Sequence, residues 1–327
     1  MQAVVQTQYG SPSVLTIKEV AKPIPKDGEV LIRVYATTVN RTDCAIMRAK
    51  PFFMRFFTGL LKPKKSTPGT DFAGKIEAIG KNVRGFRVGD NVFGFNDMGL
   101  QTHAQYTTIS IDKAIVKMPS NMTHQEAVAC VEGAHYAYNI IKKVKINPRQ
   151  KILVNGASGA IGSATVQLLK HYNANVTAVC GTQNLKLVKE LGAEQVIDYT
   201  KTDFTKTDQK FDFVFDTVGK SAFGKCKPIL NPGGVYISSE LGKMAQNVFF
   251  ALITPVIGSK KVIFPVPQDI KGSLEFIKAR IEEGNFKAVI DRIYPLQQVP
   301  DAFTYVETGQ KTGNVVIEVD VINGAEL

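Results

Sequence analysis

Residues 152–170, with the sequence ILVNGASGAIGSATVQLLK, decide the fold. An apolar run typical of a buried strand leads into Gly156, Gly159 and Gly162, and an amphipathic stretch typical of a helix follows. Glycines let the backbone turn tightly and come close to a phosphate, whose charge the start of a helix favours. The spacing is GxxGxxG rather than GxGxxG, so an ordinary strand-to-helix turn is the alternative. Because βαβ patterns flank the turn, we favour a dinucleotide phosphate site.

The sequence around this turn alternates short β-rich runs with helical segments from about residue 125 to residue 266. Such alternation is typical of a parallel sheet covered by helices on both faces, which places the chain in the α/β class. Six strands are predicted, enough for a complete doubly wound dinucleotide fold: 151–155, 175–180, 195–199, 211–216, 233–238 and 261–266.

The flanking segments have a different pattern. Residues 1–122 hold strand-like runs such as 29–37, 75–80 and 91–95, separated by Gly, Pro and Asp turns instead of long helices. After an amphipathic helix over 269–285, the run 315–319 would return to the sheet of the first domain. We therefore predict a mostly β catalytic domain made of residues 1–122 and 267–327, interrupted by a dinucleotide domain over 123–266.

The end of the second predicted strand bears on the choice of dinucleotide. An Asp or Glu there usually accepts a hydrogen bond from the ribose 2′-hydroxyl of NAD. Here the strand ends in Cys180 and Gly181, and the hydroxyl and amide side chains of residues 182–184 follow, with Lys186 nearby. Because no carboxylate stands at the strand end to repel a 2′-phosphate, we predict NADPH.

Composition sets outer limits on the function. The 327 residues are 44% hydrophobic and 21% charged, with a net charge of +11 and no Asp or Glu between Glu132 and Glu190. A positive field admits nucleic acid, a membrane surface or an anionic ligand as partner. The four cysteines form no CxxC pair, and neither a signal peptide nor a membrane-spanning run is expected, so we predict a cytoplasmic protein.

Several motifs together resemble the medium-chain dehydrogenase/reductase superfamily, in particular its zinc-free branch of quinone oxidoreductases and enoyl reductases. The resemblance covers nearly the whole chain. It rests on VNRTDC (39–44), PGTDFAGKIEAIG (68–80), RGFRVGDNVFGF (84–95), HAQYTTI (103–109), NGASGAIG (155–162), LGAEQVIDY (191–199) and TGQKTGNVVIEV (308–319). It implies a Rossmann domain, a GroES-like substrate domain, NADPH as hydride donor and a homodimer.

The resemblance also implies site residues. Asn40, Asp43 and Tyr136 are the catalytic candidates, Asn40 as a donor toward substrate or nicotinamide and Tyr136, with His135, near the nicotinamide. Turn capping by Asn40 and a packed Tyr136–His135 pair are the alternatives. Asp216 could border the nicotinamide ribose or only close its turn. The cofactor candidates are Asn40, Gly156, Ala157, Ser158, Gly159, Ala160, Ile161, Gly162, Gly181, Thr182, Gln183, Asn184, Lys186, Tyr199, Asp216, Thr217, Val218, Gly219, Lys311 and Asn314.

No metal is expected. Asn40 and Thr70 occupy places where zinc-dependent relatives carry a cysteine and a histidine, and neither residue suits zinc. Asp43, Asp71 and His103 remain as possible ligands, but a single histidine is more often a structural residue. Without a Lewis acid, the favoured chemistry is hydride transfer from NADPH to a quinone or to the C=C bond of an α,β-unsaturated carbonyl. A water or an acidic side chain would then supply the proton.

Residues 48–65, RAKPFFMRFFTGLLKPKK, are aromatic and basic. They could form an apolar lid over the acceptor, which their nearness to the motif residues favours, or an amphipathic foot on an anionic membrane. Many relatives carry a tyrosine where this chain has Ala45, so a tyrosine clamp is not expected there.

Two other function classes stay open. One is a non-catalytic dinucleotide-binding protein that senses redox state or contacts nucleic acid through its positive field. We expect no specific nucleic acid, because no aromatic-interleaved basic motif is present. The other is an alcohol dehydrogenase that works without metal.

Overall fold

The computed structural model describes residues 1–319, which form two compact units. Of the described residues, unit 1 comprises Met1–Glu132, Ile270–Glu282 and 289–319. Unit 2 comprises Gly133–Asp269 and Glu283–Ala288. The chain passes between the two units at 132/133, 269/270, 282/283 and 288/289. The domain boundaries predicted from the sequence, 122/123 and 266/267, stay predictions.

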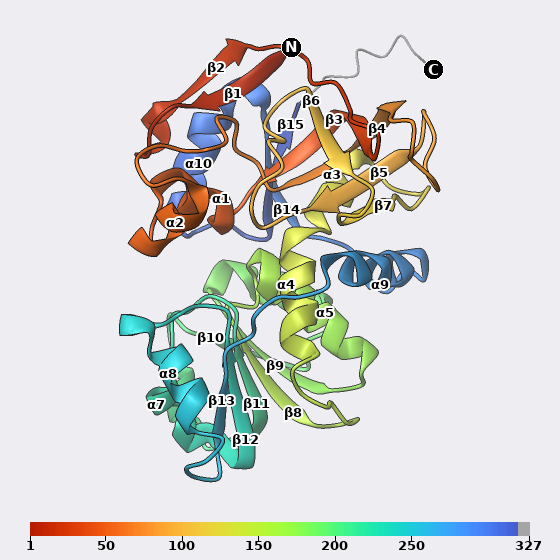
Figure 1. Cartoon of the computed structure of the whole chain (residues 1–327). Coiled ribbons are helices and arrows are strands. Elements are labelled where there is room, and N and C mark those ends of the chain that lie inside the picture. The colour runs from red at the N-terminus through yellow and green to blue at the C-terminus, as the bar shows by residue number, and fades with distance from the viewer. Residues whose placement is uncertain (320–327) are drawn as a thin grey trace. The chain divides into compact units, whose positions relative to one another are not determined.

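Unit 2 is built on a six-stranded, all-parallel sheet (Figure 1). Its strand order is β10-β9-β8-β11-β12-β13, so the chain starts in the middle and winds outward in both directions. The strands are β8 (Lys151–Asn155), β9 (Asn175–Cys180), β10 (Gln195–Asp198), β11 (Phe211–Asp216), β12 (Leu230–Ser238) and β13 (Lys261–Ile263). This arrangement confirms the predicted doubly wound fold, although β10 and β13 end earlier than predicted and β12 begins earlier.

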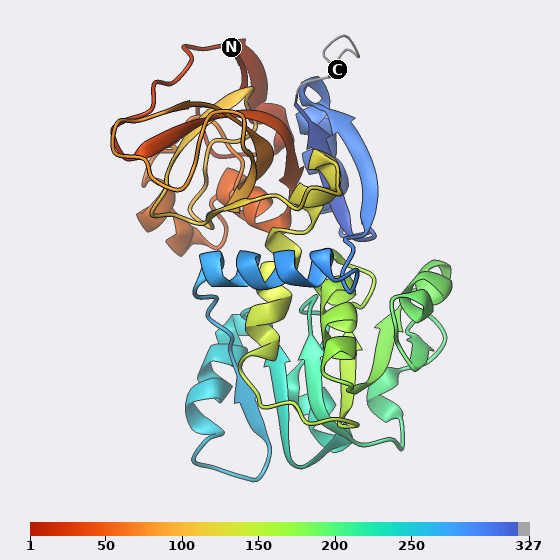
Figure 2. The ribbon, with the colours of Figure 1, turned by 90° about the vertical axis from the view of Figure 1, so that its right-hand side faces the viewer.

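Helices cover this sheet, and Figure 2 shows them on either side of the strands. Within unit 2, α5 packs on β8 and β9, while α7 and α8 pack beside β12 and β13. The helices are α4 (Glu132–Ile141, which begins at the last residue of unit 1), α5 (Ala160–His171), α6 (Leu185–Glu190), α7 (Phe223–Cys226) and α8 (Gln246–Ile253). Fully buried Tyr236, Phe211 and Phe215 form part of the core.

The sheet's register aligns the candidate residues at one edge. Asn155 pairs with Val179 and Asp216, and Asp198 pairs with Cys180. Because all six strands are parallel, their carboxyl ends meet there, and ligands of open parallel sheets bind at that edge.

Unit 1 is mostly β, as predicted. Its main sheet runs β14-β15-β3-β4-β5-β7, with β6 also pairing with β3, and β1 and β2 form a separate antiparallel pair. The strands are β1 (Gln2–Gln6), β2 (Leu15–Glu19), β3 (Glu29–Val39), β4 (Asp71–Ile79), β5 (Asn91–Phe95), β6 (Tyr106–Ser110), β7 (Ile115–Lys117), β14 (Ile290–Pro295) and β15 (Asn314–Glu318). β15 lies antiparallel to β3, which confirms that the C-terminal run rejoins the first sheet.

The helices of unit 1 are short apart from one. They are α1 (Arg41–Arg48), α2 (Arg55–Thr58), α3 (His124–Ala129), α9 (Ile270–Glu282) and α10 (Val299–Glu307). The core beneath them includes Phe72, Ile76, Met47 and Phe303. Within residues 1–319, none of the helices combines the length and apolar character that a bilayer span requires.

Candidate functional site

The glycine turn of unit 2 joins β8 to α5. Gly156 has a φ of +80°, and a methyl group added to it would lie 2.7 Å from the Val218 side chain. A methyl group on Gly162 would lie 2.1 Å from the carbonyl oxygen of Gly156. On Gly159 the nearest atom would be 3.5 Å away, an ordinary contact. Packing alone therefore requires glycine at the first and third positions, whereas the second position would accept a methyl group.

The start of α5 has unfilled hydrogen-bonding capacity. Gly159 is its N-cap residue and no side chain caps the helix, so the amides of the first turn have no side-chain acceptor. Those amides and the helix dipole favour a phosphate group, which makes the turn a fitting cradle for a dinucleotide. Ala157 and Ala160 are buried beneath it, while Ser158 and Ile161 are partly exposed.

The end of β9 brings together several predicted contacts of the 2′-phosphate. A methyl group on Gly181 would lie 3.0 Å from the Gln183 amide and 3.4 Å from the Tyr199 hydroxyl, so these three positions are neighbours. Asn184 is buried, whereas Lys186 is exposed and lies 3.8 Å from Glu190. The glycine, amide and hydroxyl groups thus form one cluster, while the lysine is on the solvated surface.

A carboxylate that the sequence analysis missed lies beside this cluster. Asp198, at the end of the neighbouring strand β10, accepts a 2.6 Å hydrogen bond from the Thr182 hydroxyl. Hydrogen bonds from Thr182 and Thr200 lower the pKa of Asp198, so it is charged at neutral pH. No carboxylate follows the β9 strand itself, but sheet pairing supplies one from β10. Reading one strand end in isolation could not reveal this.

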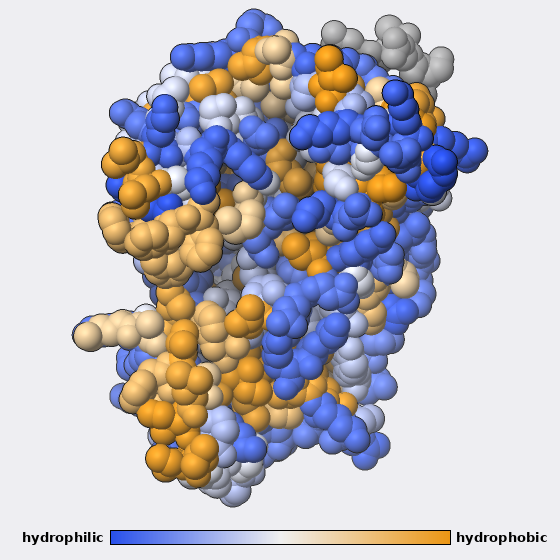
Figure 3. All heavy atoms as spheres, viewed as in Figure 1, coloured by the Kyte–Doolittle hydropathy of each residue, from blue (hydrophilic) through white to orange (hydrophobic). Residues whose placement is uncertain are grey.

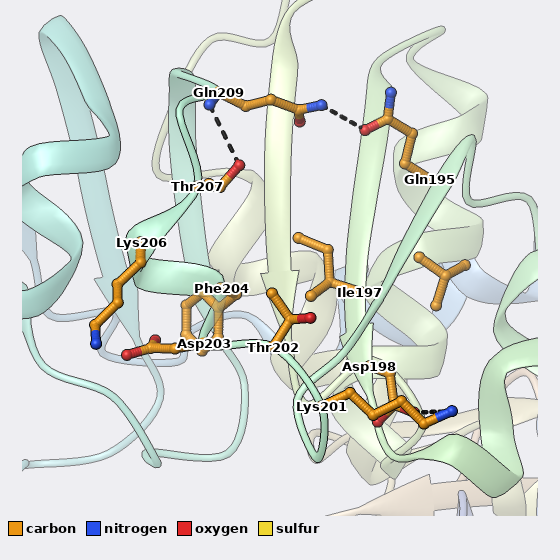
Figure 4. A pocket seen from close by; sticks show the side chains of 11 residues that line it. Gln195, Ile197, Asp198, Lys201, Thr202, Asp203, Phe204, Lys206, Thr207 and Gln209 are labelled. Carbon is orange, nitrogen blue, oxygen red and sulfur yellow. Dashed lines mark hydrogen bonds and ion pairs between the residues drawn. The ribbon is translucent and has the colours of Figure 1, made fainter.

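A surface cavity of about 620 Å³ runs along the edge strand β10 (Figure 4). Asp198 stands at one end of it with Lys201 3.9 Å away, and Gln195 and Gln209 are joined by a 2.9 Å hydrogen bond at the other. Apart from Asp198, no residue of the cavity contacts a predicted site residue through a hydrogen bond described here. We therefore do not assign the cavity to the candidate site.

The turn after β11 is held by Asp216. The fully buried carboxylate accepts hydrogen bonds from the Asn155 amide at 3.0 Å, the Tyr236 hydroxyl at 2.9 Å and the Gly219 and Ser221 amides at 3.0 Å each. This network gives Asp216 a structural role, in line with turn closure.

Two of its neighbours also contact the glycine turn. Thr217 donates to the carbonyl oxygen of Asn155 at 2.7 Å. The Val218 side chain faces Gly156. The turn after β11 therefore adjoins the glycine turn at the same sheet edge.

In unit 1, Asn40 and Asp43 form a capping box at the start of α1. The Asn40 side chain accepts from the Asp43 amide at 2.9 Å and donates to the Thr70 hydroxyl at 2.8 Å, while Asp43 accepts from the Asn40 amide at 3.1 Å. Asn40 therefore caps the turn, as its alternative interpretation stated. Asp43 is buried, and its Oδ1 atom has no hydrogen-bond partner among the described residues.

Asp71 and His103 lie near this turn, and both bond to Thr38. The Asp71 carboxylate accepts from the Thr38 amide and hydroxyl at 2.7 and 2.6 Å, and burial raises its pKa to about 6. His103 Nε2 lies 2.9 Å from the Thr38 carbonyl oxygen, and burial lowers its pKa to about 4. Within residues 1–319, no group of three or more His, Cys, Asp or Glu side chains could hold a metal ion.

Glu132 is a second residue that the sequence analysis missed. It is 7% exposed and accepts a 3.2 Å hydrogen bond from the Thr42 hydroxyl on α1. Burial raises its pKa to about 7, with Lys311 opposing the rise and Asp71 and Asp97 adding to it. The available signal was a single carboxylate inside the apolar run AVACVEGAHYAYNII (127–141).

Carboxylates and an ammonium group therefore share one buried region of unit 1. Burial raises the pKa of Asp43 well above its usual range, with Asp71 and Glu132 contributing through repulsion. Burial also lowers the pKa of Lys311, which Glu132 opposes, and the Lys311 ammonium donates to the Gly313 carbonyl oxygen at 2.6 Å. Mutually perturbed acids and bases of this kind are typical of functional sites.

Asn314 and Tyr136 make contacts of their own. Asn314 is buried and donates through its side chain to the Val289 carbonyl oxygen at 3.0 Å. Tyr136 lies on α4 in unit 2 with its ring 5.5 Å from that of His135, which is the packed pair named as an alternative. Each unit thus assembles its own candidates: a phosphate cradle in unit 2 and a buried acid–base cluster in unit 1.

Comparison with known proteins identifies the family. The sequence model of the alcohol dehydrogenase GroES-like domain matches residues 26–143, and that of a zinc-binding dehydrogenase family matches residues 191–317. The chain is 33% identical to the 2-methylene-furan-3-one reductase of Solanum lycopersicum, over 97% of this chain and 79% of that one. It is 31% identical to the chloroplast envelope quinone oxidoreductase homolog of Arabidopsis thaliana, over 97% and 98%.

The chain belongs to the medium-chain dehydrogenase/reductase superfamily, in its quinone oxidoreductase branch. The fold agrees with this assignment. The structure of Escherichia coli quinone oxidoreductase complexed with NADPH matches with a TM-score of 0.82 and 22% identity, covering 98% of this chain and 100% of that one. The GroES-like and Rossmann folds of this superfamily correspond to unit 1 and unit 2.

Proposed function

We propose that this superfamily member is an NADPH-dependent oxidoreductase that reduces quinones or the C=C bond of α,β-unsaturated carbonyls without zinc. The observation that carries the proposal is the uncapped start of α5, with a glycine that accepts no side chain before it (Gly156) and another in its first turn (Gly162). The names of its relatives, a 2-methylene-furan-3-one reductase and quinone oxidoreductases, support the acceptor class.

NADPH, when bound, supplies a hydride to the β-carbon of an enone or to a quinone ring. We propose that the glycine turn (156–162) holds its pyrophosphate and that the cluster at 181–186 with Tyr199 holds its adenosine end. We propose the turn 216–219 as a contact of the ribose. Asn40, Lys311 and Asn314 of unit 1 are kept as separate candidates for contact with the cofactor. The exposed Lys186 would add only a weak, salt-screened attraction.

We propose Glu132 as the source of the proton. Reduction of an enone leaves negative charge on the carbonyl oxygen and requires a proton at the α-carbon. A carboxyl group with a pKa of about 7 is partly protonated at neutral pH, so it can give up a proton and regain it from water. Asn40 and Asp43 would position the adjoining loop, and the Tyr136 hydroxyl would donate a hydrogen bond to the developing oxyanion.

The donor set of unit 1 supports zinc-independent chemistry. Asn40 and Thr70 hydrogen-bond to each other at 2.8 Å, and neither supplies a thiolate or an imidazole. Treatment with a strong chelator should therefore leave NADPH oxidation unchanged. A loss of activity that zinc alone restores would contradict this part of the proposal.

We also propose a homodimer. The edge strand β13 leaves one side of its backbone without a strand partner in the sheet, and Phe249 and Leu252 on the adjacent helix α8 are exposed. A second copy could cover both features. Light scattering of the purified chain measures this directly, and a monomer at micromolar concentration would contradict it.

We propose that the protein works in the cytoplasm, with peripheral contact to a membrane through residues 48–65. All four cysteines are buried and free, which suits a reducing compartment. Fractionation of cells that express the full chain tests this location.

The deciding experiment measures NADPH oxidation by the purified chain with a panel of quinones, enals and enones. Turnover with at least one acceptor, and faster turnover with NADPH than with NADH, is expected. Binding of NADPH without turnover would favour a non-catalytic dinucleotide-binding protein. Reduction of NADP⁺ by simple alcohols would instead indicate a metal-free alcohol dehydrogenase.

A further inference from the structure

Residues 44–70 carry one sign of charge. This stretch of 27 residues holds six cationic side chains and no Asp or Glu, although the whole chain has 29 acidic residues among 327. The cations are Arg48, Lys50, Arg55, Lys62, Lys64 and Lys65. An acid-free stretch of this length gives one face of unit 1 a local positive field.

Apolar side chains of the same stretch point into solvent. The apolar face, defined here as Phe52, Phe53, Phe56, Phe57, Leu60 and Leu61, has side chains that are 47% to 86% exposed. Figure 3 shows apolar side chains gathered over α2 on unit 1. Soluble proteins rarely expose so many large apolar side chains together unless the surface binds something.

The backbone beneath the apolar face is fixed. The Tyr9 hydroxyl lies 2.8 Å from the Thr58 hydroxyl and donates to the Gly59 carbonyl oxygen at 2.7 Å. The Lys65 ammonium donates to the carbonyl oxygens of Met98 and Gly99 at 3.2 and 2.5 Å. Tertiary contacts therefore hold the middle of this segment and its C-terminal flank, so the outward rings are a feature of the folded unit.

The cations divide into two groups. Arg48 pairs with Glu307, the Arg55 guanidinium lies 5.0 Å from the Tyr9 ring centre, and Lys65 bonds the two carbonyl oxygens named above, so these three support the segment. Lys50, Lys62 and Lys64 are exposed around the apolar face. The result is a set of aromatic and aliphatic side chains rimmed by lysines, the composition of a surface that inserts shallowly between anionic lipids.

Charge decides between the possible occupants. A two-fold contact with a second copy would place the lysine rim against itself, which repulsion disfavours. A lid over the acceptor explains the rings but not the exposed lysines. An anionic bilayer satisfies both, because rings enter the headgroup region while lysine stems extend to lipid phosphates.

We propose that residues 50–64 bind reversibly to the surface of bilayers that contain anionic lipid. This proposal specifies the kind of membrane for the contact proposed above. Only its biological purpose depends on the proposed function. That purpose is to bring the reductase to lipophilic quinones or enones dissolved in the bilayer. Binding itself does not require catalysis.

The test is cosedimentation of the full chain with vesicles of phosphatidylcholine alone or mixed with phosphatidylglycerol. Binding is expected only to the mixed vesicles and should weaken as salt rises. The triple variant Phe52→Ser, Phe56→Ser, Leu61→Ser should reduce the partition coefficient at least about tenfold, because inserted apolar area is lost. Equal binding to both vesicle types, or no binding, would overturn the proposal.

Two further variants separate charge from a general loss of apolar surface. The variant Lys50→Glu, Lys62→Glu, Lys64→Glu should abolish binding to the mixed vesicles. The control variant Ile24→Ser, Val88→Ser, Ile293→Ser removes exposed apolar side chains elsewhere on unit 1 and should bind like the parent. Loss of binding in the control as well would contradict a local membrane surface.

Activity in solution distinguishes this proposal from the lid and from the proposed function. With a water-soluble quinone and no vesicles, the Phe/Leu variant should keep its KM and kcat. A raised KM together with unchanged vesicle binding would assign the segment to the acceptor site and overturn the proposal. If the chain binds vesicles but none of the acceptors tested supports NADPH oxidation, the proposed membrane contact stands and the proposed reductase activity is refuted.

Discussion

The glycine turn of unit 2 is built from backbone groups, whereas the acid–base cluster of unit 1 is built from titratable side chains. The turn works through backbone amides and through the absence of side chains at Gly156 and Gly162. The cluster works through carboxyl groups such as Asp43 and Glu132, whose protonation depends on burial and on one another. The comparison teaches that steric room and proton affinity can be altered separately in this protein, because each is concentrated in a different unit.

Among the variants proposed, Gly162→Ala is expected to have the largest effect. The added methyl group would lie 2.1 Å from the Gly156 carbonyl oxygen, so the turn must shift. We expect a loss of about 1–3 kcal/mol in the free energy of unfolding. Two or more charge-assisted hydrogen bonds to phosphate should also be lost, which weakens NADPH binding about 1000-fold.

Thermal unfolding and fluorescence titration with NADPH measure these effects. Gly159→Ala is the matched control, since its methyl group meets nothing closer than 3.5 Å and should leave the melting temperature unchanged. Normal NADPH affinity in both variants would contradict the proposal that this turn binds the pyrophosphate.

Glu132→Gln tests the acid–base cluster of unit 1. If Glu132 supplies the proton, the variant should lower kcat with an enone about 100-fold. With a pKa near 7, the acid form is present below pH 7 and lost above it, so kcat of the parent should fall as pH rises through 7. The variant should lack that inflection, and Glu132→Asp should restore part of it.

The same change bears on stability. Because the folded-state pKa of about 7 lies above the usual carboxyl value of about 4.3, the parent's free energy of unfolding should fall as pH rises between these values. Denaturant unfolding of Glu132→Gln at several pH values should show a smaller fall. Glu275→Gln, at an exposed position of α9, is the control and should behave like the parent in both assays.

Asp198→Asn tests whether a side-chain charge also affects binding at the site in unit 2. Its carboxylate bonds Thr182, one of the predicted contacts of the 2′-phosphate. Removing a negative charge several ångströms from a phosphate should tighten NADPH binding about fivefold and leave NADH almost unchanged. Equal effects on the binding of both cofactors, measured by titration calorimetry, would show that the 2′-phosphate does not bind near Thr182.

Lys186→Ala should have the smallest effect. The lysine is exposed and already lies near Glu190, so its attraction to a phosphate is screened by solvent and salt. We expect less than about a twofold change in the dissociation constant for NADPH. A tenfold loss would show that Lys186 swings onto the cofactor, and that this site uses side-chain charge after all.

Sequence patterns predicted the parts of the fold that depend on local repetition. Runs such as 151–155 and 211–216 match β8 and β11, because strands of a parallel sheet covered on both faces are short and rich in apolar residues. The short β13 ends at Ile263, since Pro265 lacks the amide that continued pairing requires.

The candidate site was less accessible to sequence reasoning wherever distant elements meet. Asn40 and Asp43 were found because they share one motif, whereas Glu132 contacts Thr42 across a sequence separation of 90 residues. Asp198 was missed for the same reason, because its effect on Thr182 arises from strand pairing. Neither carboxylate belongs to a local pattern that reports its environment.

The pairing of β15 with β3 also governs the order in which the chain can mature on the ribosome. Residues Ala36–Val39 of β3 receive their partners only when residues 315–318 emerge, and Val315, the partner of Val39, follows it by 315 − 39 = 276 residues. By then all of unit 2 has been synthesised and can already have closed its own sheet. Release of the chain before β15 would leave that part of β3 as a bare edge, and such fragments should aggregate instead of persisting as truncated enzyme.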